Sequence, residues 1–89
     1  MTWRIEFLPE AEKDLAQLDR VVARRILRVL KDRIAPLDDA RALGEPLRGP
    51  LAKYWKYRIG DHRMVCRIED SRITVIVVRV GHRREEIYR

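Results

Sequence analysis

The first residues of the chain alternate between apolar and polar side chains. Trp3, Ile5 and Phe7 occupy every second position, and this period of two is typical of a β-strand with one buried face. Pro9 follows closely, and proline suits the first turn of a helix because its missing N–H would have no partner there. We therefore expect a strand over 2–8 and a helix that begins at Pro9.

Two helical patterns follow, separated by a short break. Apolar residues recur at helical spacing in the first pattern, at Ala11, Leu15 and Leu18. The second pattern runs over 21–34, and its apolar face consists of Val22, Ile26, Val29, Leu30 and Ile34. Asp19 is placed to cap the second helix, and Pro36 ends it. The patterns predict a helical hairpin whose basic outer face is interpreted as solvated, with contact to a partner as the alternative.

The second half of the chain contains three strand-like runs. Residues 36–53 are interrupted by proline and glycine and are expected to form a loop. The runs that follow are 54–59, 62–69 and 72–80. Gly-Asp between the first two predicts a hairpin, better suited to a type II′ than a type I′ turn. The order predicts an α+β fold (β-α-α-β-β-β): an N-terminal strand, a helical hairpin packed on one sheet face, and a three-stranded antiparallel meander.

The length of 89 residues indicates a single domain over 1–89. The chain has one cysteine, Cys66, which excludes an intramolecular disulfide and fits a reducing compartment. The sequence shows no leader and no apolar run of about 18 residues that would span a membrane. We therefore expect a cytoplasmic protein without a membrane segment.

Positive charge is concentrated in the C-terminal part of the chain. The net charge is +6; residues 1–52 carry 10 basic and 9 acidic residues, whereas 53–89 carry 10 and 5. Such a balance favours an anionic partner, either nucleic acid or an acidic protein.

Strand parity sorts the basic residues of the meander. Lys56 and Arg58 share one face of their strand, and Arg63 and Arg67 share one face of the next. If the apolar residues between them face the helices, all four cations project from the opposite face of the sheet. They would repel one another unless an anion joined them, so the pattern predicts a phosphate site.

The sequence contains no motif for a metal site or a nucleotide-binding loop. No His, Cys, Asp or Glu grouping has the spacing of metal ligands, and there is no glycine-rich phosphate loop, so we expect no metal and no cofactor. His62 is interpreted as a solvent-facing turn residue. The remaining side chains that invite a chemical role are interpreted as core residues: Cys66, Trp3 and Trp55.

Two segments, PLRGPLAKYWKYRIGDHRMVCRIED and VRVGHRREEIYR, resemble the RelE branch of the RelE/ParE toxin superfamily, and the resemblance covers essentially the whole chain. It implies the toxin of a type II toxin–antitoxin system, which enters the ribosomal A site and cleaves mRNA there without a metal. It also implies a hetero-oligomer with a cognate RelB-like antitoxin, whose acidic or amphipathic segment would cover the basic surface.

The resemblance assigns catalytic roles by position to Lys56, Arg63, Arg83 and Tyr88. The family often has a second lysine where this chain has Tyr54, and Arg58 or Lys53 would have to replace it. The residues expected to contact RNA are Lys53, Tyr54, Arg58, Arg67, His82 and Arg84.

Attack of a 2′-hydroxyl on the adjacent phosphate requires a base, a stabiliser of the phosphorane and an acid. Arg63 and Arg83 suit the phosphorane, because a guanidinium pairs with phosphate oxygens and keeps its proton. Lys56 or Tyr88 would transfer protons, and the choice of base and acid stays open. Two alternatives remain: a ParE-like DNA gyrase inhibitor on the same fold, and a non-catalytic nucleic-acid-binding module.

Overall fold

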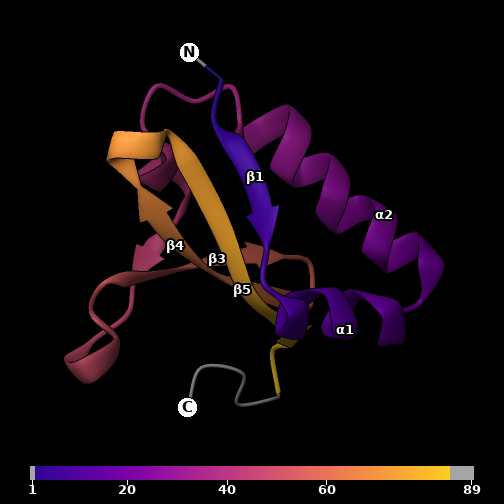
Figure 1. The fold of residues 1–89 in the computed structure, drawn as a ribbon. Coiled ribbons are helices and arrows are strands. Elements are labelled where there is room, and N and C mark those ends of the chain that lie inside the picture. Colours follow the sequence, from indigo (N-terminus) through magenta and orange to yellow (C-terminus); the bar gives the residue numbers. More distant parts are fainter. Residues whose placement is uncertain (1, 85–89) are drawn as a thin grey trace.

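A mixed β-sheet forms the centre of the molecule. The computed structural model describes residues 2–84, and within them one five-stranded sheet has the order β1-β5-β4-β3-β2 (Figure 1). The strands are β1 (Arg4–Phe7), β2 (Glu45–Pro46), β3 (Tyr54–Ile59), β4 (His62–Glu69) and β5 (Thr74–His82). β1 lies parallel to β5, and the other neighbouring strands are antiparallel. The predicted α+β fold and its meander are confirmed.

The predicted helical hairpin is present. α1 (Pro9–Gln17) begins with Pro9 in its first turn, and α2 (Arg20–Val29) is capped by the Asp19 carboxylate, which accepts a hydrogen bond from the backbone N–H of Val21 at 3.1 Å. α2 continues into the π-helical turn η1 (Leu30–Ile34), in which the N–H of Ala35 donates to the carbonyl of Leu30. Pro36 follows, and because it lacks an N–H it cannot extend this pattern.

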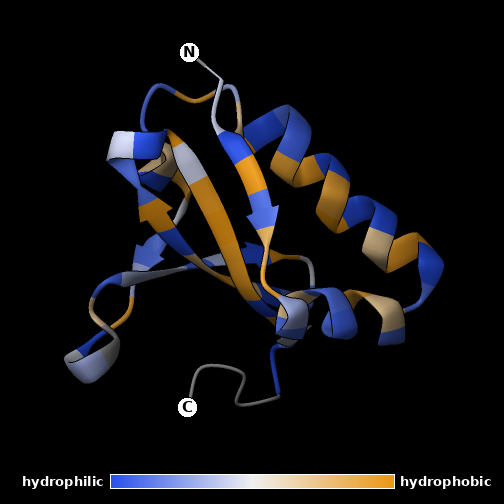
Figure 2. Ribbon diagram, in the orientation of Figure 1, coloured by the Kyte–Doolittle hydropathy of each residue, from blue (hydrophilic) through white to orange (hydrophobic). Residues whose placement is uncertain are grey.

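The core lies between the helices and one face of the sheet, as the pattern predicts. Figure 2 shows apolar residues along β5 and on one side of α2. The helical side of the core includes Ala11, Ile26, Leu30 and Ile34, and the sheet contributes Tyr57, Ile59, Met64, Cys66, Val75, Val77 and Val80. Burial of each large apolar side chain contributes roughly 1.5–3 kcal/mol before the entropic cost of folding.

The segment between the helices and β3 is more structured than the predicted loop. It contains the 3-10 turns η2 (Ala40–Leu43) and η3 (Gly49–Leu51), with β2 between them. β2 pairs with β3, placing Glu45 opposite Lys56 and Pro46 opposite Trp55. A two-residue strand shows no period along the chain, so only its pairing partner defines it. Pro46 is compatible with this edge position because proline cannot donate to a further strand.

β5 contains a β-bulge that accompanies hydrogen bonds to α1. Val65 lies opposite Arg79 whereas Cys66 lies opposite Val77, so Val78 is an extra residue on β5. The Asp14 carboxylate of α1 accepts hydrogen bonds from Val80 N at 2.8 Å and from Arg79 Nε at 2.9 Å. The bulge lies on β5 and leaves the pairing of β3 with β4 regular.

Candidate nucleic-acid interface

The face of the sheet opposite the helices carries the basic residues of β3 and β4. We call it the open face and define it by Tyr54, Lys56, Arg58, Arg63, Val65 and Arg67. In the register Tyr54 lies opposite Arg67, Lys56 opposite Val65, and Arg58 opposite Arg63. Cross-strand partners project from the same face of a sheet. The four cations that parity grouped together therefore share one face.

A hollow of about 250 Å³ lies at the end of the sheet, beside the β3–β4 turn. We call it the basic hollow; it is lined by Arg58, Gly60, His62, Arg63 and Arg83. The turn has φ of +60° at Gly60, while its second residue has no positive φ, which agrees with the predicted type II′ turn. The N–H of Arg83 donates to the carbonyl of Asp61 at 2.8 Å, holding the residues after β5 against this turn.

Three guanidinium groups converge on the basic hollow. Arg58 and Arg63 are direct cross-strand partners, and like charges in this arrangement destabilise a sheet. Arg83 Nη1 lies 3.8 Å from Asp61 Oδ1, but both side chains are more than half exposed, so this pair offsets little of the repulsion. A phosphate in the hollow would neutralise the cluster and accept hydrogen bonds from it.

Lys56 has a carboxylate neighbour that sequence reasoning missed. Its Nζ lies 3.8 Å from Glu45 Oε2, and only 16% of the Lys56 side chain is exposed. The contact depends on β2, which places Glu45 beside Lys56. Strand parity placed Lys56 among cations, and the structure adds an anion next to it. Glu45 is 63% exposed and belongs among the candidate proton-transfer groups.

His62 and His82 meet at the edge of the basic hollow. They are cross-strand partners, and their rings form a T-shaped contact with centroids 5.4 Å apart. His82 Nδ1 accepts a hydrogen bond from the N–H of Arg84 at 3.2 Å. His62 lines the hollow and is half-buried. It is the first residue of β4 rather than part of the turn, because it pairs with His82 of β5 across the sheet.

The other predicted RNA contacts are more dispersed. Arg67 forms an ion pair with Glu69 at 3.0 Å, away from the hollow, and Arg72 joins Glu69 to Glu6. The hydrogen bond from Arg72 holds the pKa of Glu69 below its ordinary value. Lys53 and Arg84 are exposed. Tyr88, a predicted catalytic residue, lies outside the described residues.

The residues interpreted as core have that role. Cys66 is fully buried, and burial raises the pKa of its thiol. Trp3 is buried and donates from Nε1 to the carbonyl of Leu37 at 2.9 Å. Trp55 is half-buried, and the Arg41 guanidinium lies 5.8 Å from the centre of its ring.

The described residues contain neither a cluster of metal-ligating side chains nor a membrane-spanning helix. Within 2–84, no group of three or more His, Cys, Asp or Glu residues is arranged to hold a metal ion. None of the helices in this part of the chain has both the length and the apolar character needed to cross a membrane.

Residues 5–87 match the family described as the ParE toxin of a type II toxin–antitoxin system, parDE. The chain is also 33% identical to toxin RelG of Mycobacterium tuberculosis, over all of this chain and 99% of RelG. This chain belongs to the RelE/ParE toxin superfamily. The resemblance stated from the sequence is confirmed, and the chain is a toxin of the RelE/YoeB type.

One further relative supports this membership, and two solved structures share the fold. Toxin YoeB of Mycobacterium bovis is 37% identical over 81 residues, which cover 84% of this toxin and 93% of YoeB. The toxin–antitoxin complex RelBE2 of Mycobacterium tuberculosis contains a chain that superposes with a TM-score of 0.86 at 27% identity, covering 96% of this toxin and 95% of that chain. The Escherichia coli toxin RelE, as a mutant in complex with a peptide of the antitoxin RelBc, has the same fold, with a TM-score of 0.70 at 24% identity over 92% of this toxin and 84% of that chain.

Proposed function

We propose that this toxin is a metal-independent endoribonuclease that cleaves mRNA in the ribosomal A site and thereby inhibits translation. The observation that carries the proposal is the basic hollow. Arg58, Arg63 and Arg83 come from three separate segments and line one space of about 250 Å³, a size that suits a phosphate group and its immediate substituents.

In the proposed reaction the 2′-oxygen forms a bond to phosphorus while the bond from phosphorus to the 5′-oxygen breaks. The products are a 2′,3′-cyclic phosphate and a 5′-hydroxyl. Arg63 and Arg83 donate hydrogen bonds to the phosphorane, whose negative charge exceeds that of the starting phosphodiester. These contacts therefore strengthen in the transition state and accelerate the reaction.

Two proton transfers complete the step. A base removes the proton of the 2′-hydroxyl, and an acid protonates the departing 5′-oxygen. The Lys56–Glu45 pair contributes a donor and an acceptor only 3.8 Å apart. The proposed proton-transfer residues are therefore Lys56, Glu45 and Tyr88. Substitution of each residue separately will assign the base and the acid.

The ribosome would supply the positioning that this small site lacks. The basic hollow is lined by five residues at the end of a sheet, which holds one phosphate but does not fix the nucleotides on either side. Alignment of the 2′-oxygen with the leaving oxygen can account for a large part of a rate enhancement. Binding of mRNA in the A site would supply this alignment.

We further propose a cognate antitoxin as the partner, in a cytoplasmic hetero-oligomer. The support is the similarity to a RelBE2 toxin–antitoxin chain from Mycobacterium tuberculosis at 27% identity, together with the net charge of +6. An acidic or amphipathic segment of that antitoxin complements the basic surface.

The decisive experiment is induction of the toxin without antitoxin, followed by mapping of mRNA 5′ ends. We expect growth arrest and new ends in frame with translated codons. Arg63→Ala or Arg83→Ala should abolish both, whereas the matched variant Arg20→Ala, an exposed arginine outside the basic hollow, should retain both. Thermal unfolding of each purified variant verifies that it is folded. Arrest by a folded Arg63→Ala variant, with the cuts unchanged, would contradict the proposal.

The second candidate function, inhibition of DNA gyrase, is favoured by the ParE description of the matching family. A supercoiling assay with the purified toxin separates the two functions. Inhibition of gyrase without in-frame mRNA cuts would establish the second and reject the first.

A further inference from the structure

Tyr54 and Arg67 lie next to each other at the end of the open face that is remote from the basic hollow. They are direct cross-strand partners on β3 and β4. Arg58, which lines the basic hollow, is the fourth residue after Tyr54 along β3. At the rise of an extended strand, this stretch is about 13 Å long. We call Tyr54 and Arg67 the remote pair.

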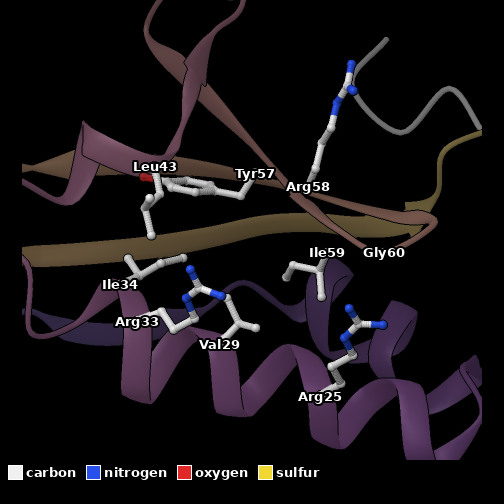
Figure 3. A pocket seen from close by; sticks show the side chains of 9 residues that line it. All are labelled: Arg25, Val29, Arg33, Ile34, Leu43, Tyr57, Arg58, Ile59 and Gly60. Carbon is white, nitrogen blue, oxygen red and sulfur yellow. The ribbon is translucent and has the colours of Figure 1, made fainter.

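The alternation of β3 turns Tyr54 away from the helices. In Figure 3 Ile59 points toward α2, whereas Arg58 points to the other side of the strand. Tyr54 has the parity of Arg58 and therefore shares its side. Tyr57 has the parity of Ile59; it is buried, and its hydroxyl donates to the carbonyl of Ala40. Tyr57 thus belongs to the core, whereas Tyr54 is half-buried on the open face.

The charges beside the remote pair are balanced, in contrast to those of the basic hollow. Arg67 forms an ion pair with Glu69 at 3.0 Å. Arg72 pairs with both Glu69 and Glu6 at 2.8 Å. Two guanidinium groups and two carboxylates therefore neutralise one another. A phosphate gains less here than in the basic hollow, because each guanidinium already binds a carboxylate.

The sheet around the remote pair is apolar on this face. Val65 shares the open face with Arg67 on β4, and Ile76 lies opposite Arg67 on β5. Both side chains are almost fully buried, although cross-strand partners of open-face residues project away from the helices. A planar ring and a planar guanidinium thus stand together over apolar side chains. Planar groups of these two kinds stack on nucleobases.

This chemistry distinguishes a base from a phosphate. A phosphate requires donors whose charge is not already paired, and these line the basic hollow. A base presents a flat face that stacks on an aromatic ring whatever the local charge. Both places lie on one face of β3 and β4, so a single RNA strand can place a phosphate in the hollow and a base on Tyr54.

We infer that Tyr54, with Arg67 beside it, is a stacking platform for the base of a nucleotide that flanks the cleaved phosphate. The inference rests on the proposed function, since it assigns the same RNA to the open face. Stacking holds the strand on one side of the basic hollow and so helps to align the phosphate inside it. A purine is favoured at this position, because its larger ring system stacks over a greater area.

The test measures binding of the full chain to a fluorescently labelled 2′-O-methyl RNA of about eight nucleotides, which spans such a site and cannot be cleaved. Fluorescence anisotropy gives the affinity. Tyr54→Ala should weaken binding by about tenfold, because one base stack is lost. Tyr54→Phe keeps the ring and should bind within about twofold of the wild type. Neither variant should change the salt dependence of binding, because neither removes a charge.

Strands that each contain one abasic nucleotide locate the stacked base. One of them should bind the wild type about tenfold more weakly than the intact strand, and that strand should not distinguish Tyr54→Ala from the wild type. The matched control is Leu43→Ala, which shortens a half-exposed side chain on the helical side of the sheet and should leave binding unchanged. Thermal unfolding verifies that each variant is folded.

Two results would overturn the inference. One is an equal loss of affinity in Tyr54→Phe and Tyr54→Ala, which would assign the contact to the hydroxyl. The other is the same loss in Tyr54→Ala for the intact strand and for every abasic strand, which would show that no base meets the ring.

The same measurements separate this inference from the proposed function. If Arg63→Ala weakens binding and Tyr54→Ala does not, the platform is rejected while the RNA site in the basic hollow stands. If the wild-type chain binds a base through Tyr54 but induction produces no mRNA cuts, the platform stands and the proposed cleavage is rejected.

Discussion

Arginine serves two different purposes in this chain, and the place of each side chain in the fold distinguishes them. Arg41 pairs with Asp70, Arg72 with Glu69, and Arg79 with Asp14; these residues connect elements of the fold. Arg58 and Arg63 are cross-strand partners on β3 and β4, and both line the basic hollow. Placing like charges together costs stability, and the arrangement is best explained by an anionic ligand.

Tyr57 provides a test of packing at the residue scale. Its hydroxyl is buried and donates to the carbonyl of Ala40 at 2.7 Å, and burial raises its pKa, so it remains a donor at neutral pH. Tyr57→Phe should lower the free energy of unfolding by about 1–2 kcal/mol, because the Ala40 carbonyl loses its buried partner. Urea denaturation measures this change.

Tyr54→Phe is the matched control for that prediction. Tyr54 lies on the same strand but is less buried, and its substitution should change stability by less than about 0.5 kcal/mol. Equal effects from the two variants would show that the hydrogen bond to Ala40 contributes nothing specific.

At the scale of elements, short turns tie the long connection to the sheet. Arg41 in η2 binds the carboxylate of Asp70 in η4 (Asp70–Arg72) through two hydrogen bonds, of 3.0 and 2.6 Å. The two residues are 29 positions apart in the chain. This contact holds the segment before β2 in place, and β2 in turn positions Glu45 beside Lys56.

Two ion pairs, Arg41–Asp70 and Arg72–Glu69, predict that the stability of the fold depends on pH. The hydrogen bond from Arg41 lowers the pKa of Asp70, and that from Arg72 lowers the pKa of Glu69. A lowered pKa means that the unfolded chain binds more protons in acid. The stabilisation is therefore present above the ordinary carboxyl pKa values and is lost as the pH falls through the lowered ones.

Urea unfolding at pH 6 and pH 3 measures the effect. Asp70→Asn should lose less stability than the wild type between these two values, because its side chain no longer titrates. Asp38→Asn, which alters an exposed carboxylate outside the ion pairs, should behave like the wild type. A wild-type stability that rises on acidification would contradict the prediction.

At the scale of the whole molecule, the two layers present different basic surfaces. The open face carries the basic hollow, and arginines of the helical layer line further hollows along α2. The net charge of +6 is therefore not confined to the face that carries the proposed phosphate site.

Salt dependence tests the phosphate site. Binding of a single-stranded oligonucleotide that lacks the reactive 2′-hydroxyl should weaken with salt, with a slope of log K against log salt of about −0.7 for the one phosphate held in the basic hollow. Arg63→Ala should weaken binding and reduce the magnitude of this slope. Arg20→Ala should leave it unchanged, and equal slopes for both variants would exclude a phosphate contact by Arg63.

Much of the fold followed from local patterns. The period of two in β3 and β4 predicted which residues share a face, because successive side chains of a strand point to opposite sides. Pro9 and Asp19 predicted the helix starts, because capping depends on residues within one turn. Family resemblance then singled out Arg63 and Arg83, which the structure brings to one hollow.

The tertiary structure decided the contacts between distant segments. Glu45 reaches Lys56 through a two-residue strand, His62 meets His82 across β4 and β5, and Asp14 supports the bulge at Val78. Each contact depends on pairing between segments well separated in the chain, and no local period records such pairing. The sequence alone therefore determined which faces are apolar and which are basic, because charge and hydrophobic period are local properties of the chain. Packing decided which basic residues meet, because proximity between distant segments is not a local property.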